Sequence, residues 1–113
     1  MKKNFNQEEF DKDSNNAIQS SNYLWIGKTI FMREALDSRD VIKLSEVKKL
    51  ILKENTYSWS EDKKSFYLIS EPKTLFSAHE SYNGVSILHN KNISFISTCR
   101  RVSKQLKAYT KII

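Results

Sequence analysis

Residues 57–70 read YSWSEDKKSFYLIS, and this stretch decides the fold class. Two runs rich in aromatic and other large apolar side chains flank the polar segment Glu61–Lys64. Such runs around a short polar loop are typical of a β-hairpin. Alternation places Tyr57 and Trp59 on one face of the first strand. The stretch therefore predicts an antiparallel sheet as the frame of the protein.

Two glycines occur in the chain, and their positions predict two more hairpins. Gly27-Lys28 separates two strand-forming runs within residues 24–32 and suits a two-residue type II′ loop. Asn83-Gly84 suits a type I′ turn between strands at 74–82 and 85–89. Because glycine lacks Cβ, it adopts the positive φ that these turns need.

The remaining strands follow one another at short spacing. Pro72 lacks an N–H donor and interrupts the run that precedes it. The turn 90–92 precedes an expected strand at Ile93–Thr98. Every connection is too short for a parallel crossover, so we expect an antiparallel meander of six or seven strands.

Two helices complete the predicted α+β domain. Ser45 is the expected N-cap of a short internal helix with one apolar face. Residues 41–44 before it are interpreted as strand or loop, in preference to a backward extension of this helix. A C-terminal amphipathic basic helix is expected from a cap at Thr98 to the end of the chain. Its apolar residues recur at helical spacing: Cys99, Val102, Leu106, Tyr109 and Ile113.

The chain of 113 residues is long enough for a single domain. Residues 1–22 are polar and acid-leaning, and we interpret them as a tail that frays or docks through Phe5 and Phe10, ahead of one domain at 23–113. Cys99 is the sole cysteine, which fits a reducing compartment, and the first residues lack the apolar stretch of a signal peptide. No apolar run reaches the roughly 20 residues that a membrane span needs. A cytoplasmic protein is expected.

Positive charge gathers at the C-terminal end of the sequence. The formal net charge is +6, and residues 99–113 contain five basic and no acidic side chains. On a helix, Arg100, Lys104, Lys107 and Lys111 form a ridge opposite the apolar face. A ridge without interleaved acids predicts an anionic partner, whereas an ordinary solvated helix face is the competing interpretation. The predicted binding residues are Arg100, Arg101, Lys104, Lys107, Lys111 and Lys91.

No catalytic, cofactor or metal motif is found. Cys99 beside two arginines could become a thiolate, but a small buried residue of the apolar stripe is the favoured interpretation. His79, Glu80 and His89 do not have, with Cys99, the spacing of known metal sites. Neither glycine belongs to a phosphate-binding loop.

The aromatic residues on the expected strands could stack on unpaired bases. Residues 56–98 have no net charge, however, and aromatic side chains on strands more often form the core. A stacking platform is therefore the weaker hypothesis for this group, which contains Trp25, Trp59, Tyr57, Phe66 and Tyr67.

The sequence favours a small non-enzymatic binding module that holds an anionic partner, with nucleic acid preferred over an acidic protein surface. The alternative is an inhibitor or adaptor of the kind that viruses and mobile elements encode. Such a protein would dock an acidic surface or a sheet edge of its partner, and a strand edge such as residues 29–34 could also pair two copies. A third hypothesis is an enzyme that depends on Cys99. No cofactor is expected.

Overall fold

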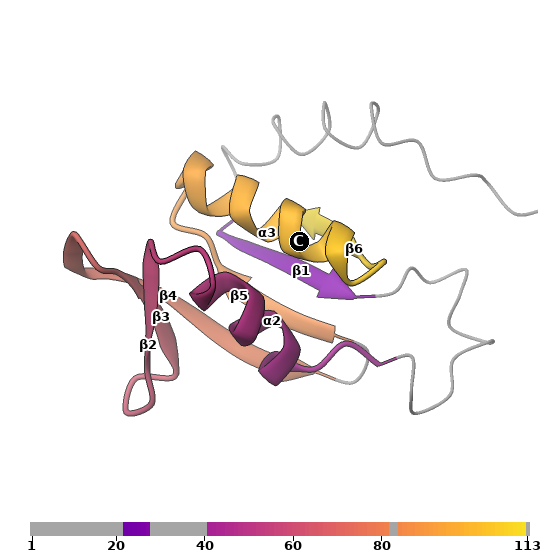
Figure 1. Ribbon diagram of the computed structural model, residues 1–113, viewed down its shortest axis with the longest axis horizontal. Coiled ribbons are helices and arrows are strands. Elements are labelled where there is room, and N and C mark those ends of the chain that lie inside the picture. The colour runs from indigo at the N-terminus through magenta and orange to yellow at the C-terminus, as the bar shows by residue number, and fades with distance from the viewer. Residues whose placement is uncertain (1–21, 28–40, 82–83, 113) are drawn as a thin grey trace, which may run out of the picture.

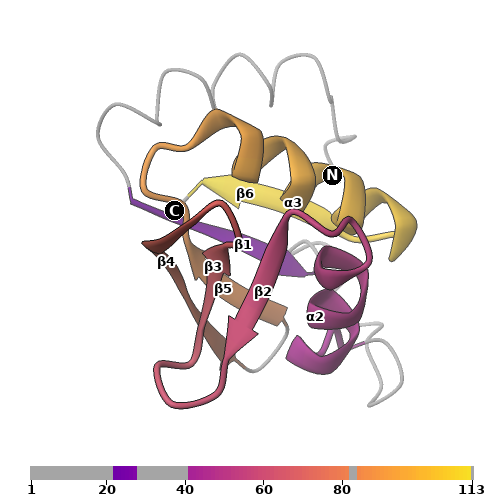
Figure 2. The same cartoon turned by 60° about the vertical axis from the view of Figure 1, so that its left-hand side comes forward.

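The chain forms a six-stranded antiparallel sheet with two helices on one of its faces (Figures 1 and 2). This computed structural model describes residues 22–27, 41–81 and 84–112, and the counts of elements refer to these ranges. The predicted α+β class is confirmed. The strands are β1 (Tyr23–Gly27), β2 (Tyr57–Ser60), β3 (Ser65–Leu68), β4 (Glu71–Ser81), β5 (Gly84–Leu88) and β6 (Tyr109–Ile112); the helices are α2 (Leu44–Leu52) and α3 (Ile93–Gln105).

The hairpin of residues 57–70 is confirmed. Strand β2 pairs with β3, and Ser60 lies opposite Ser65, so the four polar residues between them form the loop. Strand β4 begins at Glu71, earlier than the expected start at residue 74. Pro72 lies at the second position of β4, near the strand start where a missing donor is tolerated.

The strand order differs from a simple meander. The order across the sheet is β2-β3-β4-β5-β1-β6, so four strands follow in sequence and the first strand then enters between β5 and β6. Both edges of β1 are paired along its length. The hairpin predicted across Gly27 is therefore wrong, because β1 has no edge left for it; its second arm lies outside the described residues. The φ angle of Gly27 is also not positive.

The hairpin of β4 and β5 forms as predicted, but its turn is displaced by one residue. Ser81 pairs with Gly84, so the two-residue connection is 82–83 rather than 83–84. Gly84 lies opposite Gly27 of β1, and a Cβ on Gly84 would overlap the Ile26 carbonyl oxygen. Gly84 is thus required for the close approach of two strands.

Residues 41–43 before helix α2 form no regular element, as expected, but Leu44, which was also expected outside the helix, is its first residue. The N-cap of α2 is Lys43 rather than the predicted Ser45. The Lys43 N–H donates to the Glu46 carboxylate at 3.2 Å, and the Leu44 N–H donates to Glu80 Oε2 of β4 at 2.7 Å. Two carboxylates at a helix N-terminus complement its dipole. Val47 and Ile51 are buried against the sheet.

Helix α3 begins five residues before the predicted cap at Thr98, so the strand expected at Ile93–Thr98 is wrong. Asn92 caps α3, since its side chain accepts the Phe95 N–H at 3.0 Å. Phe95 and Ile96 are both buried while Ile93 is 61% exposed. Two adjacent buried positions do not fit a half-buried strand, but they do fit the face of a helix.

Helix α3 ends at Gln105, so the C-terminal basic helix is much shorter at this end than predicted. The Ala108 N–H donates to Ser103 O, and the Lys107 N–H donates to Lys104 O. Lys107 has a φ of 53°. These bonds define a Schellman motif, in which the left-handed position is usually glycine. The chain then turns back and pairs as β6 with β1.

The core lies between the sheet and the two helices. Phe95 of α3 inserts into a group of aromatic rings from β2, β3 and β4. Its ring stacks on Phe76 with centroids 3.9 Å apart, and it meets Tyr57 edge-on at 5.2 Å. Phe66 completes this group. Leu24, Ile26, Val85 and Ile87 fill the other half of the core.

Candidate functional site

The predicted basic ridge does not exist as one surface. Arg100 and Lys104 lie on α3, but Lys107 follows the helix end and Lys111 lies on β6. A ridge of four bases at helical spacing requires a helix that continues beyond Gln105, and the Schellman motif stops it there. The structure therefore divides the six predicted residues among several places.

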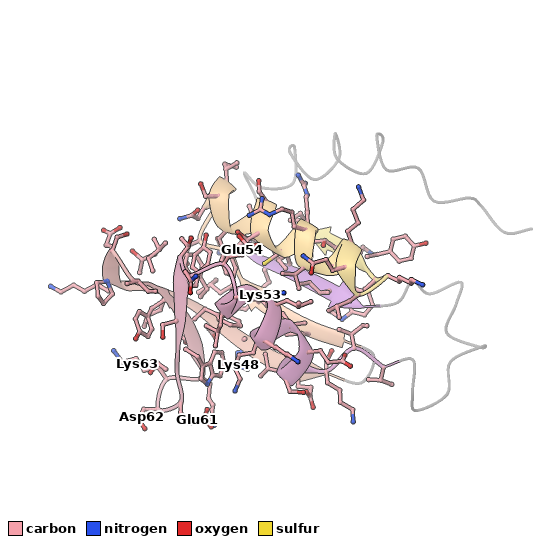
Figure 3. All side chains as sticks on the ribbon, in the orientation of Figure 1. Lys48, Lys53, Glu54, Glu61, Asp62 and Lys63 are labelled. Atoms are coloured by element: carbon pink, nitrogen blue, oxygen red, sulfur yellow. The ribbon has the colours of Figure 1, made fainter. Side chains whose placement is uncertain are left out.

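Arg101 lies where the C-terminal end of α2 meets the middle of α3. Its Nη2 atom donates to Glu54 Oε1 at 2.7 Å and to Thr98 Oγ1 at 3.0 Å, and Nε donates to Glu54 Oε2 at 3.4 Å. These bonds to Glu54 raise the pKa of Arg101 above its ordinary value. Figure 3 shows Glu54 between the two helices. Arg101 thus joins α2 to α3 and keeps its charge at every physiological pH.

Three exposed lysines lie on the two helices that meet at this junction. Lys104 lies one turn beyond Arg101 on α3, and Lys53, which caps α2, directly precedes Glu54. Lys49 lies one turn before Lys53, since four residues separate them. Within the described ranges, none of the three ammonium groups lies within ion-pair distance of a carboxylate. We call Lys49, Lys53, Arg101 and Lys104 the helix-junction surface.

Arg101 and Lys104 were among the residues predicted from the sequence, whereas Lys49 and Lys53 were not. Their signal is a pair of basic residues four apart on a short helix. The pair contributes to a larger basic surface only because α2 packs beside α3, and a local sequence pattern does not reveal such a tertiary contact. The packing brings together charges from residues about 50 positions apart in the chain.

Most acidic side chains in the described ranges are engaged within the protein. These ranges contain thirteen basic and six acidic residues. Glu46 and Glu80 accept backbone N–H groups at the start of α2, and Glu54 binds Arg101. Glu61 pairs with Lys64 at 2.5 Å and accepts the Trp59 indole N–H. The basic residues that remain in excess over the acidic ones are mainly lysines.

The other predicted binding residues are distributed elsewhere. Arg100 is half-buried, and its Nε and Nη2 atoms are shielded from solvent. Lys91 is in the turn before α3, so the length of that helix, about 20 Å, separates it from Lys104. Lys111 pairs with Trp25 and alternates with the buried Thr110, which places Lys111 on the sheet face opposite the helices.

Cys99 is fully buried on the inner side of α3. Burial raises the pKa of its thiol, so the thiolate is disfavoured. The interpretation of Cys99 as a core residue agrees with this position. Among the residues that the structure describes, no three His, Cys, Asp or Glu side chains form a group able to hold a metal ion.

The aromatic residues considered for stacking are divided between the two faces. Tyr57 and Phe66 are core residues. The Trp59 ring packs against Phe66 with centroids 4.9 Å apart, and the Lys48 ammonium lies 5.1 Å from the Trp59 centroid. Trp25 instead lies on the face opposite the helices, because its neighbours Leu24 and Ile26 are buried beneath them.

In comparisons with family models, curated proteins and solved structures, no match to this chain was found. The described helices are also too short and too polar to cross a bilayer.

Proposed function

We propose that the protein is a small non-enzymatic module that binds the phosphate backbone of a nucleic acid on the helix-junction surface. The observation that carries the proposal is the set of three exposed lysines around Arg101, drawn from two helices and without partner carboxylates in the described ranges. A surface with an excess of positive charge favours a polyanion. Lysine supplies phosphate contacts as a point charge, and such contacts carry little sequence information.

Glu54 offsets the charge of Arg101, and the three lysines supply the remaining positive charge of the surface. It is the acidic residue beside the surface, and it already holds Arg101 through two hydrogen bonds. Arg101 therefore has a fixed side chain that is still 56% exposed, and it loses little freedom when a phosphate arrives. The lysines need no rearrangement of the fold to reach an anion, since all three are exposed.

The test removes two of these charges and measures the salt dependence of binding. Lys53→Gln/Lys104→Gln is compared with Lys63→Gln/Lys73→Gln, which makes the same change in net charge at exposed sites on the β2–β3 loop and β4. Figure 3 labels Lys63 on that loop, away from the junction. Binding is followed by fluorescence anisotropy of a labelled oligonucleotide from 25 to 200 mM salt.

We expect the first variant to lower the slope of log K against log salt by about 1.4–1.8, because each phosphate contact contributes roughly 0.7–0.9. The control variant should keep the wild-type slope. Equal losses in the two variants would show that only net charge matters, and absence of wild-type binding at 25 mM salt would refute the proposal. Thermal unfolding of both variants confirms that the fold is retained.

A protein partner is the second candidate, and the sheet edges favour it. Strands β2 and β6 form the two edges of the described sheet, so each has one row of backbone groups outside the sheet ladder. Such an edge can pair with a partner strand or with a second copy of the chain. A partner that stays bound in stoichiometric amount after nuclease treatment would favour the inhibitor or adaptor hypothesis. The edge predicted at residues 29–34 lies outside the described residues.

A further inference from the structure

The sheet face opposite α2 and α3 has a composition unlike the face that forms the core. Alternation assigns to this outer sheet face every residue whose neighbours point toward the helices. We define the outer sheet face as the part of this side that lies around β1, made by Ser77, His79 and Ser81 of β4, Ser86 and Leu88 of β5, Tyr23 and Trp25 of β1, and Tyr109 and Lys111 of β6. Apart from Leu88, these residues are aromatic, small and polar, or basic.

Strand register places one row of chemically distinct side chains across this face. His79 lies opposite Ser86, Ser86 lies opposite Trp25, and Trp25 lies opposite Lys111. Trp25 therefore has a serine on one neighbouring strand and a lysine on the other. His79 and Lys111 are exposed at the ends of the row, and Trp25 is half-buried.

Tyr23 extends the aromatic surface along β1. It lies two residues before Trp25 on the same face, so the two rings are about 7 Å apart along the strand. Tyr23 is 37% exposed, a high fraction for an aromatic residue in the middle strands of a sheet. Two rings at this spacing can each accept a base from neighbouring nucleotides of an extended strand.

Charge decides which partner fits the face. No carboxylate occurs among its defined residues, and Glu80 of β4 alternates to the other side, where it binds the Leu44 N–H. Lys111 beside Trp25 can neutralise a phosphate next to a stacked base. A duplex hides its base faces, whereas a single strand offers both bases and phosphates.

We propose that the outer sheet face binds unpaired bases of single-stranded nucleic acid, with Trp25 and Tyr23 as stacking residues and Lys111 as a phosphate contact. The inference adds a second surface to the proposed function and rests on it for the class of polymer. The two surfaces lie on opposite sides of the sheet (Figure 2). The helix-junction surface accepts any phosphate backbone, while the outer sheet face requires exposed bases.

Trp25 itself can report on binding. The chain has two tryptophans, so Trp59→Phe in the full-length protein leaves Trp25 as the sole indole. This variant is titrated at 50 mM salt with a twelve-nucleotide oligothymidylate and with a blunt duplex of the same length. We expect the single strand to quench the Trp25 emission and the duplex to leave it unchanged while still binding by anisotropy.

A second variant measures the stacking energy. Trp25→Val keeps a strand-forming residue, and it should weaken oligothymidylate binding about 5- to 150-fold, which corresponds to roughly 1–3 kcal/mol per stacked base. Duplex binding should not change. Lys111→Gln should lower the salt slope for the single strand by about 0.7, and Lys73→Gln should not.

The outcomes separate this inference from the proposed function. Binding of both polymers without quenching, and with no effect of Trp25→Val, would refute the stacking surface and leave the helix-junction surface standing. Quenching that persists in Lys53→Gln/Lys104→Gln, with duplex binding lost, would support both sites. Absence of binding to either polymer would overturn both.

Discussion

Substitution of Phe95 gives the sharpest test of how the segment after the 90–92 turn folds. Phe95 is fully buried, while Ile93 two residues earlier is 61% exposed. In a helix these residues point about 160° apart, given 100° per residue. In a strand they would share one face. Alanine at the two positions therefore distinguishes the two structures.

The size of the effect follows from the contacts of Phe95. Loss of a buried phenylalanine costs about 3–5 kcal/mol, because apolar contact is lost and a cavity remains. The stacked Phe76 ring and the edge-on Tyr57 ring each contribute about 0.5–1.5 kcal/mol within that cost. Ile93→Ala should change the free energy of unfolding by no more than about 0.5 kcal/mol, as is usual for an exposed position.

Urea unfolding followed by far-ultraviolet circular dichroism measures both variants. Because m is about 1–3 kcal/mol/M for proteins of this size, Phe95→Ala should lower the midpoint by roughly 1–5 M. If that variant does not fold, Phe95→Leu provides the measurement at a cost of about 1–2.5 kcal/mol, since it removes the ring contacts but keeps most of the volume. Similar losses for Ile93→Ala and Phe95→Ala would refute the helical assignment.

Two further predictions concern the ends of α3. Lys107→Gly should raise the free energy of unfolding by about 1 kcal/mol, because glycine removes the strain of a side chain at positive φ, whereas Lys104→Gly inside the helix should lower it by a similar amount; chemical denaturation tests both. The buried His89 imidazole accepts the Lys91 N–H at 2.8 Å through Nδ1, and burial lowers its pKa. The unfolded chain therefore binds the proton first, so the stability from neutral His89 is present above about pH 6.5 and is lost as pH falls below it. His89→Gln should flatten the decline in melting temperature between pH 7.5 and 5, and His79→Gln, at an exposed site, should not.

Local patterns predicted those elements whose signals lie within a few residues. Residues 57–70 formed the expected hairpin because polarity and strand-forming residues change sharply at its loop. Helix α2 also formed near the expected place, although a carboxylate from β4 satisfies its first N–H. That contact comes from 36 residues away and has no local signal.

Helix α3 shows why other expectations failed. Its first turn contains isoleucine, serine and phenylalanine in an order that fits both the two-residue repeat of a strand and the 3.6-residue repeat of a helix. The signal for a helix was Asn92, which caps it and was overlooked. Its end was missed because Lys107 occupies a position where glycine is the usual marker. The candidate site therefore differs from the predicted one. Lys107 and Lys111 lie outside α3 and do not belong to its basic face. The proposed surface includes Lys49 and Lys53 instead, because α2 packs beside α3.

The central position of β1 affects how the chain can reach its native state during synthesis. Its two neighbours, β5 and β6, begin at Gly84 and Tyr109, near the other end of the sequence. At about 5–20 residues per second, the ribosome needs several seconds to make the first of them. Throughout that interval Leu24 and Ile26 have neither neighbouring strand to pair with, so this apolar segment stays exposed until the C-terminal part of the sheet has been synthesised.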